Sequence, residues 1–243
     1  MYQGKTMLIT GVSSDIGSCI VKYFASLGVN IIMTYYSNKE KTEELECQIK
    51  DKYSVNVNSF YLDITSEESI KSLYDRLKSM NIEINYLINN SGISLDNYIF
   101  DKSKEEFMKV LEVNTVGTFL MIKYFDNIVN GFIFNMSSTD GIDTGSIYSV
   151  DYNASKAAIN SITKTFSLIS SNKIISICPN WIDSKTTRSM DKDYLESELK
   201  RIKQSKLISI DTIPKVIDDC IKKNISTGSI IRIEGDNNVR EIS

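Results

Sequence analysis

A tyrosine and a lysine that lie four residues apart, Tyr152 and Lys156, are the side chains in this sequence best suited to acid–base chemistry. Residues at this spacing share one face of a helix, so the Lys156 ammonium can lie beside the Tyr152 phenol. A positive charge there favours the phenolate and lowers a pKa that is about 10 in model peptides. The pair predicts a tyrosine acid that works near neutral pH, although the same spacing also occurs by chance on many exposed helix faces.

Histidine is absent from the sequence, and this absence limits the other chemistry available. It removes the commonest general base, the usual nucleophilic triads and most zinc sites. Acid–base work therefore falls to Tyr, Lys, Asp, Glu or Cys. The four cysteines form no CxxC pair, so we interpret them as neutral thiols in a reducing compartment and expect no metal site.

A second motif, Thr10-Gly-Val-Ser-Ser-Asp-Ile-Gly17, lies between a predicted strand and a predicted helix. Glycines at such a turn let the backbone approach a pyrophosphate, and the amides at the helix N-terminus favour its negative charge. The motif indicates a dinucleotide site. Taken alone, Gly11 and Gly17 could equally be ordinary turn and packing glycines.

Short apolar segments alternate with helical segments along most of the chain. Strands are predicted at 6–10, 30–34, 57–62, 86–89, 132–136, 174–178 and 229–233, and helices at 16–27, 39–52, 67–80, 104–125, 153–169 and 211–223. This alternation predicts an α/β fold: a Rossmann-type, doubly wound, mainly parallel seven-stranded sheet with helices on both faces. No linker is evident, so we expect residues 1–243 to form a single domain, with the polar segment 184–210 as a substrate lid.

Charge and composition argue against several partners. The net charge of −3 provides no basic field for nucleic acid or for an anionic membrane. The N-terminal segment has no long apolar stretch after a charged start, and no window approaches a membrane span. We therefore expect a cytoplasmic protein.

Both motifs, in this order, resemble those of the classical short-chain dehydrogenase/reductases, whose pattern has a TGxxxGxG turn near the N-terminus and YxxxK about two-thirds along. Asn89-Asn-Ser-Gly92 resembles the NNAG element of that family, and Asp63-Ile64 follows the third strand where the family places an adenine-binding Asp. Asn114 matches the active-site Asn, and Ser137-Ser138 match the catalytic Ser. The resemblance spans almost the whole chain, and several elements in the correct order are far more specific than one.

The resemblance implies an NAD(P)H-dependent oxidoreductase that interconverts a ketone and a secondary alcohol. Tyr152 would protonate the carbonyl oxygen as hydride arrives, and Ser138 would hydrogen-bond that oxygen. Lys156 would lower the pKa of Tyr152 and bind the nicotinamide ribose, while Asn114 would hold a water that links Lys156 to solvent. An Asn inside an apolar helix fits such a role, because its side chain competes for backbone groups.

The loop between the serines and the tyrosine leaves two alternatives open, because it is one residue longer than is common in the family. Ser137 or Thr139 takes the serine role if the register differs. Tyr148 has no lysine four residues later, so we expect it to be a pocket wall.

The resemblance also implies a cofactor site, formed by the glycine turn, the ends of three strands and the segment after Pro179. The expected contacts are Gly11, Ser13, Ser14, Asp15, Ile16, Gly17, Tyr36, Ser37, Asp63, Ile64, Asn90, Ser91, Gly92, Tyr152, Lys156, Pro179, Asn180, Ile182 and Ser184.

Three departures from the family pattern affect that site. Asp15 replaces the middle glycine of the turn, and we expect it to cap the following helix in preference to repelling phosphate. Pro179-Asn180 replaces Pro-Gly, and Asn is the next best residue for a positive φ. Trp181 then lines the substrate pocket or fills the core under the lid.

The third departure concerns the choice of cofactor. Tyr35-Tyr36 ends the second strand without the acid typical of NAD sites or the Arg typical of NADP sites. Without an acid there is no repulsion of a 2′-phosphate, and Ser14, Ser37 and Lys39 could bind it, so NADP(H) is favoured over NAD(H). Lys39 is equally consistent with an exposed helix residue.

Within the family, chain length and the segment Gly228–Gly235 resemble those of the 3-oxoacyl-acyl-carrier-protein reductases, which implies a small-molecule or acyl-carrier-linked carbonyl substrate. Sugar, polyol and steroid oxidoreductases share the scaffold and remain alternatives, as does a non-catalytic dinucleotide sensor or scaffold. A basic run at 200–206 could meet an acidic carrier or could simply be a solvated helix face. Helices 104–125 and 153–169 look apolar on more than one face, which predicts a homo-oligomer, a tetramer by family resemblance.

Overall fold

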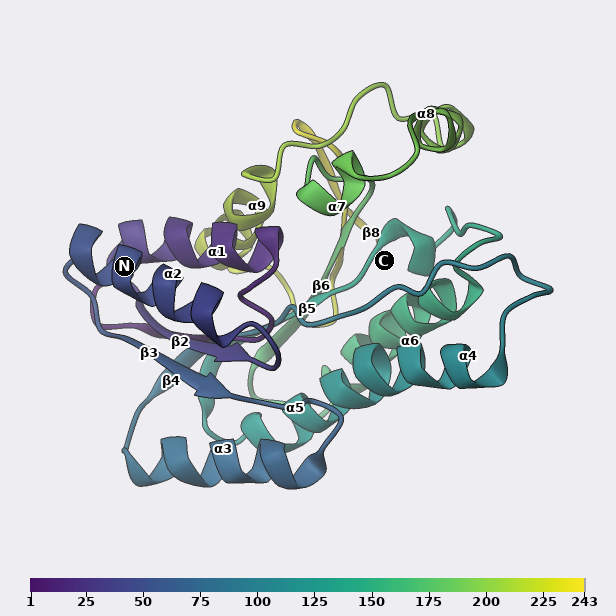
Figure 1. The fold of residues 1–243 in the computed structure, drawn as a ribbon. Helices are drawn as coiled ribbons and strands as arrows, with labels where there is room; N and C mark the ends of the chain where they lie inside the picture. The colour runs from purple at the N-terminus through teal and green to yellow at the C-terminus, as the bar shows by residue number, and fades with distance from the viewer. Residues whose placement is uncertain (243) are drawn as a thin grey trace.

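An eight-stranded sheet forms the centre of the computed structural model, which describes residues 1–242. The strands lie in the order β3-β2-β1-β4-β5-β6-β7-β8, and helices cover both faces (Figure 1). Strands β1 to β7 pair in parallel. Their bounds are Thr6–Ile9 (β1), Asn30–Tyr35 (β2), Val57–Tyr61 (β3), Ile84–Asn89 (β4), Val129–Met136 (β5), Lys173–Pro179 (β6), Ile230–Gly235 (β7) and Asn238–Ile242 (β8).

The predicted doubly wound α/β fold is confirmed, but the predicted number of strands is one too low. The chain turns back after β7, and β8 pairs with β7 in the antiparallel direction. Strand β8 lies at the edge of the sheet and is mostly exposed, so it has little of the buried apolar pattern that marks the other strands. This weak pattern explains why the sequence did not reveal it.

Two apolar cores lie on opposite faces of the sheet. Helices α1 (Asp15–Ser26), α2 (Lys39–Lys52) and α9 (Thr212–Lys222) cover one face, and α3 (Glu67–Ser79), α5 (Gly117–Phe125) and α6 (Val150–Phe166) cover the other (Figure 1). Successive side chains of a strand point to opposite faces, so Met7 joins the first core and Leu8 the second. Strands buried on both faces explain the continuous apolar runs in the sequence.

The helix predicted over 104–125 is continuous but not uniform. It consists of α4 (Lys104–Leu111), a π-helical turn at Glu112–Val116 and α5. The π turn contains Asn114, the one residue of this helix that we singled out. Such turns insert an extra residue and often occur at functional sites.

The segment predicted as a lid lies at one end of the molecule. It contains the short helix α7 (Lys185–Arg188) and helix α8 (Lys192–Arg201), which extend above the sheet at the top of Figure 1. Ile182 and Ile208 form a parallel bridge at the base of this segment and hold its two ends together. The motion of a lid, and the division of the chain into one domain, stay predictions.

Candidate active site

The predicted site residues meet where the carboxyl ends of the central strands β1, β4, β5 and β6 come together. The chain order of the strands reverses between β1 and β4, because β2 and β3 lie on one side of them and β5 to β7 on the other. Connections leave a doubly wound sheet in opposite directions at such a point, which opens a crevice for a ligand.

The glycine turn at the end of β1 has no room for side chains. Gly11 has a φ of +68°, and a Cβ there would lie 2.9 Å from Ser91 Oγ. A Cβ on Gly17 would lie 2.5 Å from the carbonyl oxygen of Gly11. The Asn90 amide donates to the carbonyls of Thr10 and Gly11 at 2.9 and 3.0 Å, which holds the turn in place. Both glycines are thus required by the close approach of the backbone.

We predicted that Asp15 caps the following helix, and this prediction is wrong. Ser14 is the N-cap residue of α1, and its hydroxyl accepts from the Gly17 amide at 3.0 Å. The Asp15 carboxylate instead accepts from the backbone amide of Lys185 at 2.6 Å and so contacts the first turn of α7. The prediction failed because the partner of Asp15 lies in a distant part of the chain.

The adenosine end of the predicted cofactor site is open. Tyr36 is 64% exposed, and its ring lies 6.1 Å from that of Tyr61, measured between centroids. Lys39 pairs with Glu43 at 3.5 Å on the exposed face of α2, which agrees with the interpretation of Lys39 as a surface residue. Lys41, which the sequence analysis missed, donates instead to the backbone carbonyl of Ser13 in the glycine turn.

Asp63 and Ile64, two further predicted cofactor contacts, are held in place by residues of their own surroundings. The Asp63 carboxylate accepts from the amide and the hydroxyl of Thr65 at 2.9 and 2.7 Å. Ile64 lies against Gly117 at the start of α5, where a Cβ would come within 3.0 Å of its side chain. Ser37 is exposed after β2.

Tyr152 and Lys156 occupy successive turns of α6, on one face of the helix. The Lys156 ammonium lies 5.2 Å from the centroid of the Tyr152 ring and donates to the carbonyl of Met136, at the end of β5, at 2.7 Å. A Cβ on Gly92 would lie 3.5 Å from Lys156 Nζ and 3.2 Å from Asn114 Oδ1. The end of β4, the π turn and α6 thus bring their functional groups to one place.

Asn114 is completely buried within the π turn, and its side chain binds backbone groups of another segment. Its Oδ1 accepts from the Ile93 amide at 2.8 Å, and its Nδ2 donates to the Ile93 carbonyl at 2.9 Å and to Ser155 Oγ at 3.0 Å. Its own carbonyl accepts from the Thr118 hydroxyl at 2.7 Å. The amide therefore fastens the loop after β4 to α6, while the predicted role in holding a water stays a prediction.

Of the three candidate hydroxyls, that of Ser138 interacts with Tyr152. Ser138 also caps a short 3₁₀ turn at Thr139–Gly141, where its Oγ accepts from the Asp140 amide at 3.1 Å. The Ser137 hydroxyl donates to the Lys156 carbonyl at 2.9 Å, and the Thr139 hydroxyl bonds Asn180. This arrangement favours the register with Ser138 beside the phenol, while the catalytic role of Ser138 stays a prediction.

The electrostatics of the pair differ from what the spacing predicts. Burial raises the pKa of the Tyr152 phenol, the nearby Asp140 carboxylate raises it further, and the Ser138 hydroxyl acts in the opposite direction. Burial also lowers the pKa of the Lys156 ammonium to about 8. The predicted lowering of the Tyr152 pKa by Lys156 is thus outweighed by desolvation, and the phenol is neutral at pH 7.

The turn after β6 also departs from the prediction. Asn180 has a negative φ, so the positive φ for which we thought Asn suitable is not used. The backbone amide of Asn180 donates to the Ile233 carbonyl at 2.9 Å. Ser184 caps α7 by accepting from the Thr187 amide at 3.2 Å, and Trp181 is half-buried, which leaves both of its predicted roles open.

These residues fit a dinucleotide. The two glycines of the turn leave space at the N-terminus of α1, whose positive dipole end favours a pyrophosphate. Gly92 and Lys156 lie further along the same edge, where a nicotinamide ribose would follow. A doubly wound sheet with this arrangement at its switch point belongs to the dinucleotide-binding class of α/β proteins.

Comparison with known proteins narrows that class to one family. The family model for short chain dehydrogenases matches residues 5–195, so the chain belongs to the short-chain dehydrogenase/reductase family of oxidoreductases. It is 28% identical to a 3-oxoacyl-acyl-carrier-protein reductase of Aquifex aeolicus over 242 residues, which cover 96% of this chain and 97% of that protein. A reductase of the same name from Rickettsia prowazekii is 31% identical over 206 residues, 82% of this chain and 81% of that protein.

One solved structure and a further relative are also similar to this chain. A blue fluorescent protein from a metagenomic library, in complex with NADPH, superposes with a TM-score of 0.88 at 19% identity and covers 97% of this chain and 99% of that one. A 3beta-hydroxysteroid dehydrogenase of Eggerthella lenta is 29% identical over 171 residues, 68% of this chain and 65% of that protein. None of the helices within residues 1–242 combines the length and apolar character needed to cross a membrane.

From the lowered pKa of Lys156 we expect turnover to depend on pH. The ammonium is charged below about pH 8 and neutral above it, so we expect the rate of carbonyl reduction to fall about tenfold per pH unit above pH 8. The measurement is the pH profile of kcat with saturating cofactor. Lys156→Met should be nearly inactive at every pH, while Lys164→Met, on the exposed part of the same helix, should keep the wild-type profile. A wild-type rate that stays level from pH 7 to pH 10 would show that the charge is not needed.

Proposed function

We propose that this protein reduces a ketone to a secondary alcohol with NADPH, and that the ketone is a 3-oxoacyl thioester or a similar 3-oxo compound. The main support is the convergence of Ser138, Tyr152, Lys156 and Asn114 beside the glycine turn. Two relatives that cover most of the chain are named as 3-oxoacyl reductases, which favours this substrate class. The carbonyl can be part of a small molecule or linked to an acyl carrier.

The bound cofactor supplies the hydride, and the protein supplies the proton. The neutral Tyr152 phenol donates a proton to the carbonyl oxygen, and the Ser138 hydroxyl hydrogen-bonds that oxygen as charge develops on it. Lys156 places a positive charge beside the phenol and offsets the phenolate that forms. Asn114 holds the loop that carries Gly92 against α6.

A test of this proposal is the loss of the phenolic proton. We expect Tyr152→Phe to lower kcat for an acetoacetyl thioester by about 10²–10⁴-fold, the usual contribution of a general acid, with little change in NADPH affinity. NADPH oxidation is followed optically, and binding by calorimetry. Tyr74→Phe, on α3, serves as the control because its side chain packs against Tyr124 and Phe125.

The same assay separates the alternatives. NADPH binding without turnover of any ketone, and no effect of Tyr152→Phe, would indicate the sensor or scaffold. Oxidation of steroid, sugar or polyol alcohols in preference to reduction of 3-oxo compounds would indicate the other branch of the family, for which the Eggerthella lenta relative is a precedent by name.

We propose NADP(H) as the preferred cofactor, with Lys41 as the residue that favours it. The end of β2 carries no acid at Tyr36, and the Lys41 ammonium already reaches the glycine turn. A 2′-phosphate in this region would be neutralised by Lys41, whereas Lys39 is paired with Glu43. The metagenomic protein of the same fold binds NADPH.

Removal of the Lys41 charge should therefore change cofactor preference. We expect Lys41→Ala to weaken NADPH binding about tenfold and NADH binding less than about twofold, because only NADPH carries the extra phosphate. Dissociation constants from fluorescence titration test this expectation, with Lys39→Ala as the matched control. Equal losses for both cofactors would assign Lys41 to the stability of the turn alone.

We propose that the protein is a homo-oligomer, a tetramer by family resemblance. Met108, Val116 and Phe119 are exposed along the helix from α4 to α5, and Phe119 packs against Phe166 at the end of α6. Exposed apolar side chains in such a row are typical of a subunit interface. Light scattering should give a multiple of the chain mass at micromolar concentration, and Phe119→Asp should lower it. A wild-type monomer would contradict this.

Three other expectations belong to the proposal. The cytoplasmic location rests on the four cysteines, which are all free thiols in the structure. The basic run at 200–206 is weaker as a carrier-binding surface than its sequence implies, because Arg201 pairs with Glu198 and Lys206 with Asp236. We also propose that residues 1–243 form one domain and that 184–210 is its lid.

A further inference from the structure

Three tyrosines from separate parts of the chain form a row beside the candidate active site. The centroid of the Tyr148 ring lies 6.0 Å from that of Tyr98, in the loop after β4, and 5.7 Å from that of Tyr194, in α8. Tyr98 and Tyr148 are each 40% exposed, so both rings present apolar surface that a ligand could cover. Tyr148, the middle ring of the row, lies four residues before the candidate acid Tyr152 in the chain.

The loop that carries Tyr98 is fixed to the first turn of α6 by a buried ion pair. Lys102 Nζ lies 3.0 Å from Asp151 Oδ2, and the two side chains are 3% and 0% exposed. The other oxygen of Asp151 accepts from the amide of Tyr152 at 2.9 Å. Buried charges are costly unless they are paired in good geometry, so this pair specifies one position of the loop relative to Tyr152.

A backbone hydrogen bond adds to this attachment. The Asn97 amide donates to the Tyr148 carbonyl at 2.8 Å, directly before Tyr98 in the chain. The first two members of the row are thus held by the same segments that hold the candidate acid. They form a rigid surface, and rigid aromatic rings bind a ligand at a low cost in conformational entropy.

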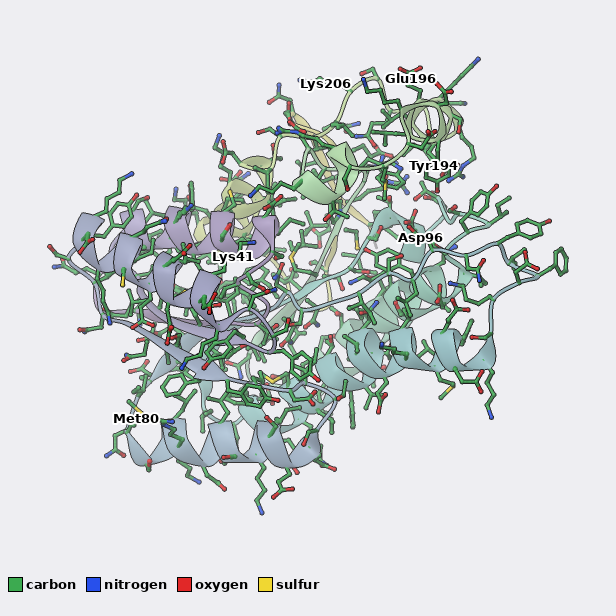
Figure 2. The ribbon with its side chains drawn as sticks, viewed as in Figure 1. Lys41, Met80, Asp96, Tyr194, Glu196 and Lys206 are labelled. Carbon is green, nitrogen blue, oxygen red and sulfur yellow. The ribbon has the colours of Figure 1, made fainter. Side chains whose placement is uncertain are left out.

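The third tyrosine joins the row from the lid segment. The hydroxyls of Tyr194 and Ser146 are 3.5 Å apart, and Arg201 of the same helix donates to the Thr144 carbonyl at 2.7 Å. Figure 2 shows Tyr194 on the side of α8 that faces the loop containing Asp96. The row therefore spans the opening between the loop and the lid.

Two acids and two cations lie around this opening. Asp96 and Asp140 both act electrostatically on the Tyr152 phenol, and Asp140 is held by the Thr144 hydroxyl at 2.8 Å. Arg201 of α8 interacts electrostatically with Asp140, and it is engaged by Glu198 and by a backbone carbonyl. The Lys156 ammonium lies beside the phenol, but it is buried and engaged by the Met136 carbonyl, so a carboxylate on the substrate would meet two acids and only cations that are already engaged.

We propose that Tyr98, Tyr148 and Tyr194 form a specificity wall that binds an apolar or aromatic side group of an uncharged ketone. This inference rests on the proposed function and narrows its substrate class. The wall takes the group attached to the reacting carbonyl, whether that group is an acyl chain or a ring, and the acidic surroundings exclude small oxo acids. The 3-oxo compound is therefore an ester or thioester and not a free acid.

The test compares two neutral 3-oxo esters, ethyl benzoylacetate and ethyl acetoacetate, in the wild type and in Tyr194→Ala. We expect the variant to lose about tenfold in kcat/KM for the aromatic ester, through KM, and clearly less for the small ester. Tyr194→Phe keeps the ring and should restore most of the loss. Met80→Ala, which removes an exposed apolar side chain at the opposite end of the molecule in Figure 2, is the matched control.

A second comparison uses each ester and its free acid. We expect the wild type to prefer the ester about tenfold or more, and Asp96→Asn to reduce that ratio, because one of the repelling charges is removed. Equal losses for both esters in Tyr194→Ala, or a preference for the free acids, would overturn the inference.

Calorimetric titration of the esters into the complex with NADP⁺ gives the affinity independently of turnover. If no ketone is reduced, the proposed function fails, while the affinities still decide whether the aromatic wall binds the larger ester more tightly. NADPH affinity, measured in parallel, should be unchanged in Tyr194→Ala. A loss there would assign the residue to folding and would count against the wall.

Discussion

The burial of the Lys156 ammonium against the edge of the sheet is the constraint on which the site depends. A buried ammonium needs a hydrogen-bond acceptor, and the carbonyl of Met136 at the end of β5 provides one at 2.7 Å. This bond sets the depth of α6, and with it the position of Tyr152 one turn earlier. The approach is so close that a Cβ on Gly141 would lie 2.4 Å from the backbone carbon of Lys156. The loop after β5 must therefore have a glycine where it crosses α6.

A column of buried polar side chains continues this attachment below the site. Asn89 on β4 donates to Asn135 on β5 at 2.8 Å, and Asn135 donates to Thr163 on α6 at 2.9 Å. Thr163 in turn lies 2.9 Å from Ser176 Oγ on β6. Apolar packing alone would allow α6 to slide along the sheet, whereas directional bonds from Thr163 to β5 and β6, continued to β4 by Asn135, specify one register. The helix that carries the candidate acid is thus fixed near its middle by Lys156 and near its C-terminal end by Thr163.

The sequence was informative where the signal is local. The alternation of strands and helices, the glycine turn and the spacing of Tyr152 and Lys156 all depend on residues close together in the chain, and they predicted the fold and the meeting place of the site. Contacts between distant segments escaped it, because nothing local marks them. Asp15 binds the amide of Lys185, and Lys41 rather than Lys39 reaches the glycine turn. The direction of the Tyr152 pKa also escaped it, since the spacing reveals the ammonium but not the degree of burial.

The lid segment connects the two halves of the candidate site. Its first helix, α7, is held by the Asp15 carboxylate at the glycine turn, and its second, α8, is held through Arg201 at the loop that carries Asp140. One end of the segment thus contacts the glycine turn, and the other end carries Tyr194 of the tyrosine row. Both contacts involve the same short segment, 184–210, so this segment joins the glycine turn to the loop after β5. The position of Tyr194 in α8 therefore depends on the glycine turn as well as on the loop after β5.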